Sequence, residues 1–364
     1  MSHEEAPQSA PSRAPDARRL RIGLIGVAAL GIAVGVAIAV FTGGGAMLSG
    51  MARLPPGVLA IALGLDVVSW LGEGVVFAAL AGLRGLRGAL RGTMAYVGGG
   101  FPGLVTPFGS GAIPGWAYAL TREGLSAGEA AAVLGARGLL TSLFFVAAGV
   151  VAIVFVPARL AGSGVASLLA LAALAAVFLV VAAIVARPAA AAGAVGRALS
   201  GRTSRRLLGA DRAERLADAA AREAERFAAS LRTLVRERPA ALLVALAGLL
   251  LSRLCLLAIL PVLLTGLGWR GDFLPVIVTV VGVQALASGS PTPGGSGAVE
   301  VAMTAALSGL ATAPVAGAAA LLWRGITFYF DLLAGWVLLA RYVAKAPPAG
   351  RAGSGTAPPV EDPA

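Results

Sequence analysis

The sequence predicts an all-α polytopic membrane protein, with about six full spans plus two re-entrant broken-helix hairpins in inverted-topology repeats. Hydrophobic residues make up 58% of its 364 residues, charged residues only 13%, and the mean hydropathy is +0.86. A soluble globular domain usually carries about 25% charged residues. Long stretches without any charge recur along the chain, and two of them are interrupted by proline and glycine. This pattern excludes a soluble enzyme, a coiled coil and a disulfide scaffold.

The N-terminal part predicts a tail followed by two spans. Residues 1–21 are polar and end in several arginines, so we expect a disordered cytoplasmic tail. The uncharged run that follows is longer than the ~7–15-residue core of a signal peptide, and we expect a span at about 22–43. A second span, 56–82, is followed by Arg84, Arg87 and Arg91, which mark a cytoplasmic end.

The next uncharged stretch predicts the first broken hairpin. Its middle, residues 98–115, reads GGGFPGLVTPFGSGAIPG. Proline removes a helical hydrogen-bond donor and clashes with the preceding turn. Irregular backbone survives at membrane depth only when it is buried in protein or lines a wet cavity. We therefore expect two half-helices within 93–121 that meet at a break.

The rest of the chain alternates apolar spans with one long polar segment. A second broken stretch, 273–311, contains SGSPTPGGSGAVE at 288–300. Arginine and acidic residues alternate with an apolar stripe at 211–238, which predicts an amphipathic cytoplasmic helix. The other elements that we expect are spans at 128–156, 164–186, 240–264 and 314–340, and a disordered cytoplasmic tail at 346–364.

An internal repeat links the two broken stretches. Residues 106–114 read TPFGSGAIP and residues 292–300 read TPGGSGAVE, identical at six of nine positions at an offset of 186. The pairs Arg137-Gly138 and Arg324-Gly325 follow at an offset of 187.

The number of membrane crossings between the two repeats gives them opposite orientations. If both hairpins are re-entrant, repeat one (56–156) starts outside and repeat two (240–340) starts inside. Both lie within an integral membrane domain at 22–345. Every arginine cluster then faces the cytoplasm, as do both termini, so we expect a multi-pass plasma-membrane protein.

Buried charges and broken helices indicate a site for an anion. Inverted repeats with broken helices are typical of secondary transporters, which bind their cargo near the midplane. Helix N-termini favour anions, and arginine fits phosphate bidentately. Asp66, Glu73 and Asp331 are possible charge partners for the arginines, and buried ion pairs that only hold helices together remain an alternative. The expected substrate-binding residues are Thr106, Pro107, Gly109, Ser110, Gly111, Arg137, Arg253, Pro293, Gly294, Gly295, Gly297, Glu300 and Arg324.

Metal and cofactor chemistry has little support in the sequence. The single histidine, His3, lies in the N-terminal tail, and the single cysteine, Cys255, lies in an apolar run. We expect no metal, no cofactor and no catalytic residue. The net charge of +11 is explained by cytoplasmic loops that face anionic lipid, so we expect no nucleic-acid partner.

Two motifs carry a resemblance to a known family. The sequence PTPGGSGAVE at 291–300 and the looser TPFGSG at 106–111 resemble motifs of the transmembrane region of lysylphosphatidylglycerol synthases, also called the flippase-like domain family. The resemblance covers roughly residues 20–345. It implies that Pro293, Gly294, Gly295, Gly297 and Glu300 belong to a lipid head-group site. In multiple peptide resistance factor proteins this region is taken to move aminoacylated phosphatidylglycerol between leaflets.

We therefore expect transbilayer movement of a phospholipid or lipid-linked intermediate, with an anionic or phosphate-bearing head group, through a midplane polar cavity. Only a short tail follows the last expected span, so we expect no aminoacyl-transfer domain and no enzyme activity. One alternative is an accessory membrane subunit of lipid or glycolipid synthesis, acting beside a separate lipid-modifying enzyme. The other alternative is a secondary transporter of a small solute or ion.

Overall fold

The computed structural model describes residues 54–155, 238–288 and 290–344, together with Met51, Arg215 and Asp218. All regular structure in these ranges is helical, which confirms the all-α polytopic class. Four helical stretches are long and apolar enough to cross a membrane: Pro56–Ala81, Ala127–Gly149, Pro239–Gly266 and Ala313–Val343. They correspond to four of the expected spans. The expected segments 1–21, 22–43, 164–186 and 346–364, and most of 211–238, lie outside the described residues.

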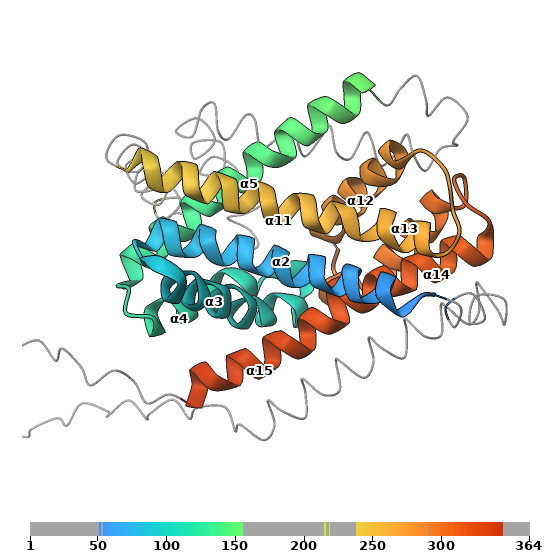
Figure 1. Cartoon of the computed structure of the whole chain (residues 1–364). Helices are drawn as coiled ribbons and strands as arrows, with labels where there is room; N and C mark the ends of the chain where they lie inside the picture. Colours follow the sequence, from blue (N-terminus) through green and yellow to red (C-terminus); the bar gives the residue numbers. More distant parts are fainter. Residues whose placement is uncertain are drawn as a thin grey trace, which may run out of the picture.

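Two long antiparallel helices form the centre of the molecule (Figure 1). Helix α2 (Pro56–Ala81) and helix α11 (Pro239–Gly266) touch at two glycines. A Cβ atom on Gly72 would lie 2.6 Å from the carbonyl oxygen of Gly248, so only glycine permits this approach. Gly266, at the end of α11, lies beside the start of α2, so the two helices run in opposite directions.

The first broken stretch is a helical hairpin. Helix α3 (Gly85–Val105) and helix α4 (Ala112–Arg122) are joined by a 3₁₀ turn at Pro107–Gly109. Thr106 leaves the helix with extended backbone, and its hydroxyl oxygen accepts a hydrogen bond from the Gly111 N–H at 2.7 Å. The first half-helix, which we expected to begin at residue 93, begins at residue 85 instead. Arg87 and Arg91 lie exposed in its first two turns and do not interrupt it.

The second broken stretch repeats this geometry. Helix α12 (Phe273–Ser288) and helix α13 (Ala298–Leu307) flank a 3₁₀ turn at Pro293–Gly295. Gly294 has φ 58° and ψ 16°, nearly the values of its counterpart Phe108, 55° and 17°. The repeated sequence therefore has a repeated backbone conformation at the turn.

The tips of the two hairpins meet. Helix α3 starts beyond the end of α2, and α12 starts beyond the end of α11. Because α2 and α11 are antiparallel, the hairpins approach the middle from opposite ends of this pair (Figure 1). The backbone N–H of Phe108 donates a hydrogen bond of 3.0 Å to the carbonyl oxygen of Ser290.

Three further helical segments complete the described part. Helix α5 (Ala127–Phe155) packs on α2 and α4. The expected span 314–340 is helical throughout, but a π-helix (Gly325–Phe330) separates α14 (Ala313–Arg324) from α15 (Asp331–Ala344). The sequence alone did not predict this π segment.

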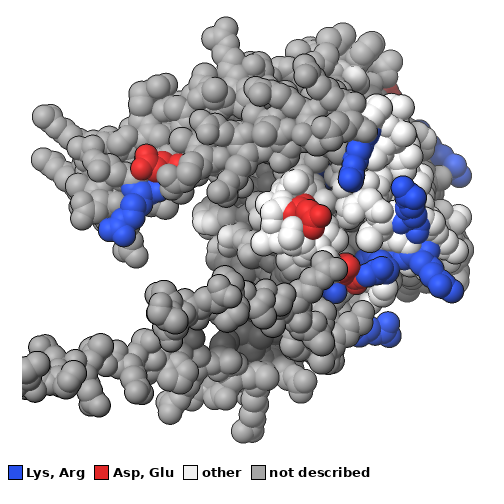
Figure 2. All heavy atoms as spheres, turned by 90° about the vertical axis from the view of Figure 1, so that its left-hand side faces the viewer, with Lys and Arg blue, Asp and Glu red and all other residues white. Residues whose placement is uncertain are grey.

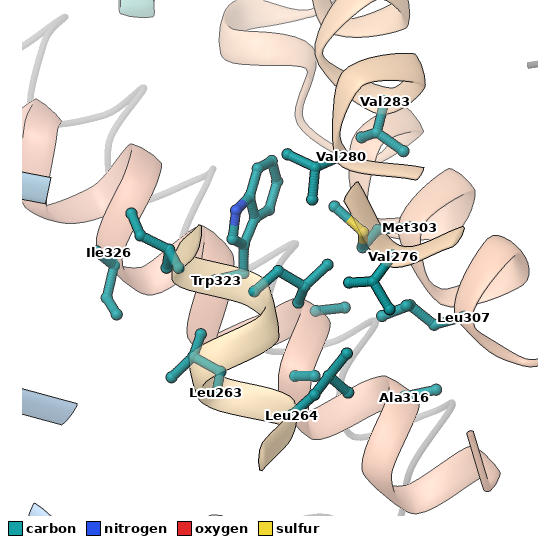
Figure 3. Close-up of a cluster of buried hydrophobic side chains, with 14 of the residues drawn as sticks. Leu263, Leu264, Val276, Val280, Val283, Met303, Leu307, Ala316, Trp323 and Ile326 are labelled. Atoms are coloured by element: carbon teal, nitrogen blue, oxygen red, sulfur yellow. The ribbon is translucent and has the colours of Figure 1, made fainter. Parts of the chain in front are cut away.

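Each hairpin has its own hydrophobic cluster. One cluster, around Phe77 and Leu120, joins α2, α3, α4 and α5 with the start of α11 and the end of α15. The other, around Met303 and Trp323, joins α12, α13 and α14 with the start of α2 and the end of α11 (Figure 3). Helices α2 and α11 thus contribute side chains to both clusters.

Candidate functional site

A cavity of about 280 Å³ lies where the hairpin tips meet the α14–α15 segment. Both hairpins contribute glycine to its wall, which exposes backbone there. The charged side chains on the wall come from the two sides of the π-helix. The lining residues are Gly103, Leu104, Gly109, Leu256, Gln284, Ala287, Gly294, Val299, Trp323, Arg324, Thr327, Phe328 and Asp331.

Arg324 is the arginine of the cavity wall. Its Nε donates to a carboxylate oxygen of Glu300 at 2.8 Å, and its Nη2 donates to the carbonyl oxygen of Gly294 at 3.0 Å. Its guanidinium carbon lies 4.1 Å from the centre of the Phe328 ring. A guanidinium carries five N–H donors, and among the described residues only these two bonds use them. Three N–H donors of Arg324 are therefore left without a hydrogen bond to the described residues.

Glu300 positions this arginine and the second hairpin tip. It is buried, and its second oxygen accepts a hydrogen bond of 2.7 Å from the Gly297 backbone N–H at the start of α13. An anionic side chain is favourable at a helix N-terminus. Glu300 therefore ties the loop, the helix start and Arg324 together without lining the cavity itself.

The other two expected arginines are held elsewhere. Glu73 on α2 is fully buried, and accepts a hydrogen bond from Arg137 Nε at 2.8 Å and another from Arg253 Nη2 at 2.7 Å. Arg137 also stacks over the ring of Trp116 at 4.3 Å. This buried group joins α2, α5 and α11, because a carboxylate between two guanidiniums offsets part of the cost of burying all three. Neither arginine lines the cavity.

Asp66 and Asp331 form a different kind of group. Asp66 is fully buried, and no nitrogen or hydroxyl donor among the described residues bonds either of its oxygens. One helical turn later on α2, Trp70 donates from its indole nitrogen to Asp331 at 2.9 Å. The Trp70 ring also stacks on Phe330, with ring centres 5.0 Å apart. Asp331 forms part of the cavity wall.

The remaining expected residues shape the hairpin turns. Among the residues expected from the motifs, the structure brings Gly109, Gly294 and Arg324 together in the cavity wall. Thr106 and Gly111 close the first turn through their hydrogen bond. Pro107 and Pro293 begin the two 3₁₀ turns, and Gly295 ends the second. Ser110 directly follows the first turn, and Gly297 directly precedes α13.

Several residues of the cavity wall and of the surroundings of Arg137 were not predicted from the sequence. Gln284 and Thr327 line the cavity, but neither carries a charge or a motif that would single it out. Tyr96, Trp116 and Phe77 surround the Arg137 guanidinium and come from separate helices. Within the described ranges, no group of three or more histidine, cysteine, aspartate or glutamate side chains is arranged to hold a metal ion.

Fold and site define a helical membrane protein in which two broken hairpins meet at a cavity with an arginine in its wall. The chain belongs to the family described as the lysylphosphatidylglycerol synthase TM region, whose sequence profile matches residues 27–335. This confirms the resemblance seen in the sequence. A comparison with curated proteins gave no match. The family and the helical structure together indicate a membrane protein with a lipid-related role.

Proposed function

We propose that this protein moves a phospholipid or lipid-linked intermediate with a phosphate-bearing head group between the two leaflets. The observation that carries the proposal is the cavity at the hairpin tips, where Arg324 keeps unused N–H donors. Planar guanidinium donors match the oxygens of a phosphate. Gly109 and Gly294 have no side chains, so a head group can approach the backbone closely.

The arrangement of the hairpins supports a route across the membrane. In this proposal both hairpins are re-entrant and the two halves are inverted-topology repeats. The opposite approach of α3–α4 and α12–α13 supports this reading. Leu256, in the central part of α11, belongs to the cavity wall, which favours a site near the bilayer midplane. Rocking of one repeat against the other then alternates access, while the acyl chains stay in lipid.

The distribution of basic side chains supports one orientation of the protein in the membrane. Basic side chains gather on the end of the molecule where α2 and α4 finish and where α3 and α11 begin (Figure 2). Cytoplasmic loops carry an excess of lysine and arginine, so in our proposal this end faces the cytoplasm of a plasma-membrane protein with both termini inside. The residues are Arg84, Arg87, Arg91, Arg122, Arg238 and Arg341.

The proposal assigns no chemical step to the protein. It acts as a lipid transporter without a cofactor, and a separate lipid-modifying enzyme makes or consumes the lipid. Arg324 and the hairpin glycines bind the head group, Glu300 positions Arg324, and none of them acts as a nucleophile or a general base.

The test uses the full chain in liposomes that contain fluorescent NBD-phosphatidylglycerol. Dithionite bleaches only the outer leaflet, so movement of the lipid exposes the protected half of the signal. We expect Arg324→Gln to slow this movement about tenfold or more, because a hydrogen bond to a charged group contributes about 1.5–3 kcal/mol. Arg324→Lys keeps the charge but loses the planar donors, and we expect an intermediate rate.

Arg341→Gln is the matched control, because this exposed arginine lies on the same segment outside the cavity. Each variant is first checked for a monodisperse elution profile. Normal movement with Arg324→Gln would contradict the site. Release of trapped inorganic phosphate, without lipid movement, would favour the small-solute alternative.

A further inference from the structure

We infer that Asp66 and Asp331 form a proton-binding pair whose occupancy is coupled to movement of the lipid. This inference rests on the proposed function and adds a co-transported ion to it. The ligand is a proton, bound between two carboxyl groups at the edge of the cavity.

The two carboxyl groups are brought together by α2 and the start of α15. Asp66 and Trp70 are four residues apart on α2, so they share one face of the helix. Trp70 bonds one oxygen of Asp331, which places Asp331 beside this face. Asp66 lies one helical turn before Trp70 on that face, so its carboxyl group lies beside that of Asp331. Asp66 is completely buried, and no other donor among the described residues satisfies it.

The cations near this pair are engaged elsewhere. Arg137 and Arg253 both bond Glu73, and Arg324 bonds Glu300. Asp66 is fully buried without a cation partner among the described residues, so a second ionised carboxylate beside it would repel it at high cost. One shared proton removes that cost, because the protonated carboxyl then donates a hydrogen bond to its neighbour. The elements packed around the pair carry further titratable or charged groups. They include Glu73 on α2, Tyr96 on α3, Arg137 on α5, Arg253 and Cys255 on α11, Arg324 on α14, Tyr329 in the π-helix, and, nearer the helix ends, Arg87 and Arg91 on α3, Glu129 on α5, and Arg341 and Tyr342 on α15.

The position of Asp331 connects the proton to the lipid site. Asp331 is part of the cavity wall and follows the π-helix directly, while Arg324 precedes it directly. Loss of the proton replaces a hydrogen bond between α2 and α15 with repulsion. The segment that carries Arg324 is then pushed away from α2. Single π-helical turns occur frequently at functional sites, where they adjust the register of a helix.

Proton binding is tested by infrared spectroscopy of the full chain in liposomes. Protonated carboxyl groups absorb separately from carboxylates. We expect wild type to retain a protonated-carboxyl band at neutral pH that is absent from the double variant Asp66→Asn/Asp331→Asn. Asp272→Asn is the matched control, because Asp272 is exposed between α11 and α12, and asparagine can still accept a hydrogen bond from the Leu274 N–H. An unchanged band in the double variant would overturn the proton site.

Coupling is tested with NBD-phosphatidylglycerol in the same liposomes. We expect a pH gradient to change the rate of movement by wild type and Asp272→Asn several-fold, and to have no effect on the double variant. Asp66→Asn and Asp331→Asn separately should each lose the response, which guards against misfolding of the double variant. If wild type responds to a sodium gradient but not to a pH gradient, or moves lipid equally fast with and without either, the coupling is overturned while the proposed function stands. If wild type moves no lipid, the proposed function is overturned, and this inference with it.

Discussion

Two features favour glycine at position 294: the backbone conformation and the packing of a neighbouring side chain. Its φ of 58° lies in the left-handed region, and a Cβ atom there would collide with the Phe328 ring. Phe328 in turn covers the Arg324 guanidinium. The counterpart in the first repeat, Phe108, has the same backbone conformation, but its side chain is 59% exposed. Glycine is therefore required in the second turn by the neighbour that it packs against, and not by the backbone alone.

A comparison of Gly294→Ala with Gly109→Ala separates these two causes. Both positions have positive φ, and alanine at either costs about 1–2 kcal/mol in backbone strain. At Gly109 the nearest atom to a new Cβ is 3.9 Å away, whereas Gly294→Ala must displace Phe328. We expect Gly294→Ala to lower the free energy of unfolding by a further 1–3 kcal/mol, roughly the cost of overpacking. Thermal unfolding in detergent measures the difference, and equal losses would contradict the packing argument.

At the level of elements, glycine sets how closely the central helices approach. Gly72 and Gly248 bring the backbones of α2 and α11 into contact. Gly92 does the same between α3 and α2, and a Cβ on it would collide with the carbonyl oxygen of Gly74. Small residues at helix contacts are typical of membrane proteins, because close van der Waals packing replaces the hydrophobic effect between helices in lipid.

A substitution series on α2 tests this role of glycine. Gly72→Ala places a methyl group 2.6 Å from the Gly248 carbonyl oxygen, so the helices must move apart. We expect a loss of roughly 1–3 kcal/mol in the free energy of unfolding. Gly64→Ala is the control on the same helix, because nothing lies within 4 Å of its new methyl group. It should be neutral, or stabilising by up to about 1 kcal/mol through helix propensity. Equal stability of the two variants would rule out the contact as a source of stability.

The helices and their breaks could be predicted because the signals are local. Long, mostly apolar runs predicted α2, α5 and α11, and proline with glycine predicted both turns. The π-helix at Gly325–Phe330 and the positive φ of Phe108 were not predicted. At both places the structure has contacts with residues distant in sequence: the Phe108 N–H bonds the Ser290 carbonyl oxygen, and Phe330 stacks on Trp70.

The site was predicted less completely, for a related reason. The sequence identified three arginines inside apolar spans, and their types alone suit a phosphate. Which of these arginines pairs with a buried carboxylate, and which lines the cavity, depends on residues far along the chain. Glu73 lies 180 residues from Arg253 and holds it in a buried ion pair. Only Arg324 reaches the cavity, because Glu300 and the second hairpin turn place it there.

At the scale of the whole molecule, the two ends differ in charge. The end formed by the α2–α3 and α4–α5 connections carries most of the exposed arginines of the described residues (Figure 2). At the opposite end, between α11 and α12, lie Arg270 and Asp272. This asymmetry underlies the proposed orientation, and the hairpins are expected to enter from different sides of the membrane.

Cysteine labelling in intact cells tests that orientation. The buried Cys255 is first replaced by serine, and single cysteines are then introduced as Arg87→Cys and Asp272→Cys at exposed positions near the starts of α3 and α12. We expect a membrane-impermeant maleimide to label position 272 in intact cells and position 87 only after permeabilisation. The reverse pattern would invert the orientation. Labelling of both positions from one side would contradict opposite entry of the hairpins.

The close contact of α2 and α11 has a mechanical consequence. These helices supply side chains to both hydrophobic clusters. Near Gly72 and Gly248 their backbones touch, and the buried ion pair of Glu73 with Arg253 joins them beside this contact. A closely packed protein interior is hardly compressible and transmits strain. A displacement of one cluster is therefore passed along α2 and α11 to the other, at the far end of the pair.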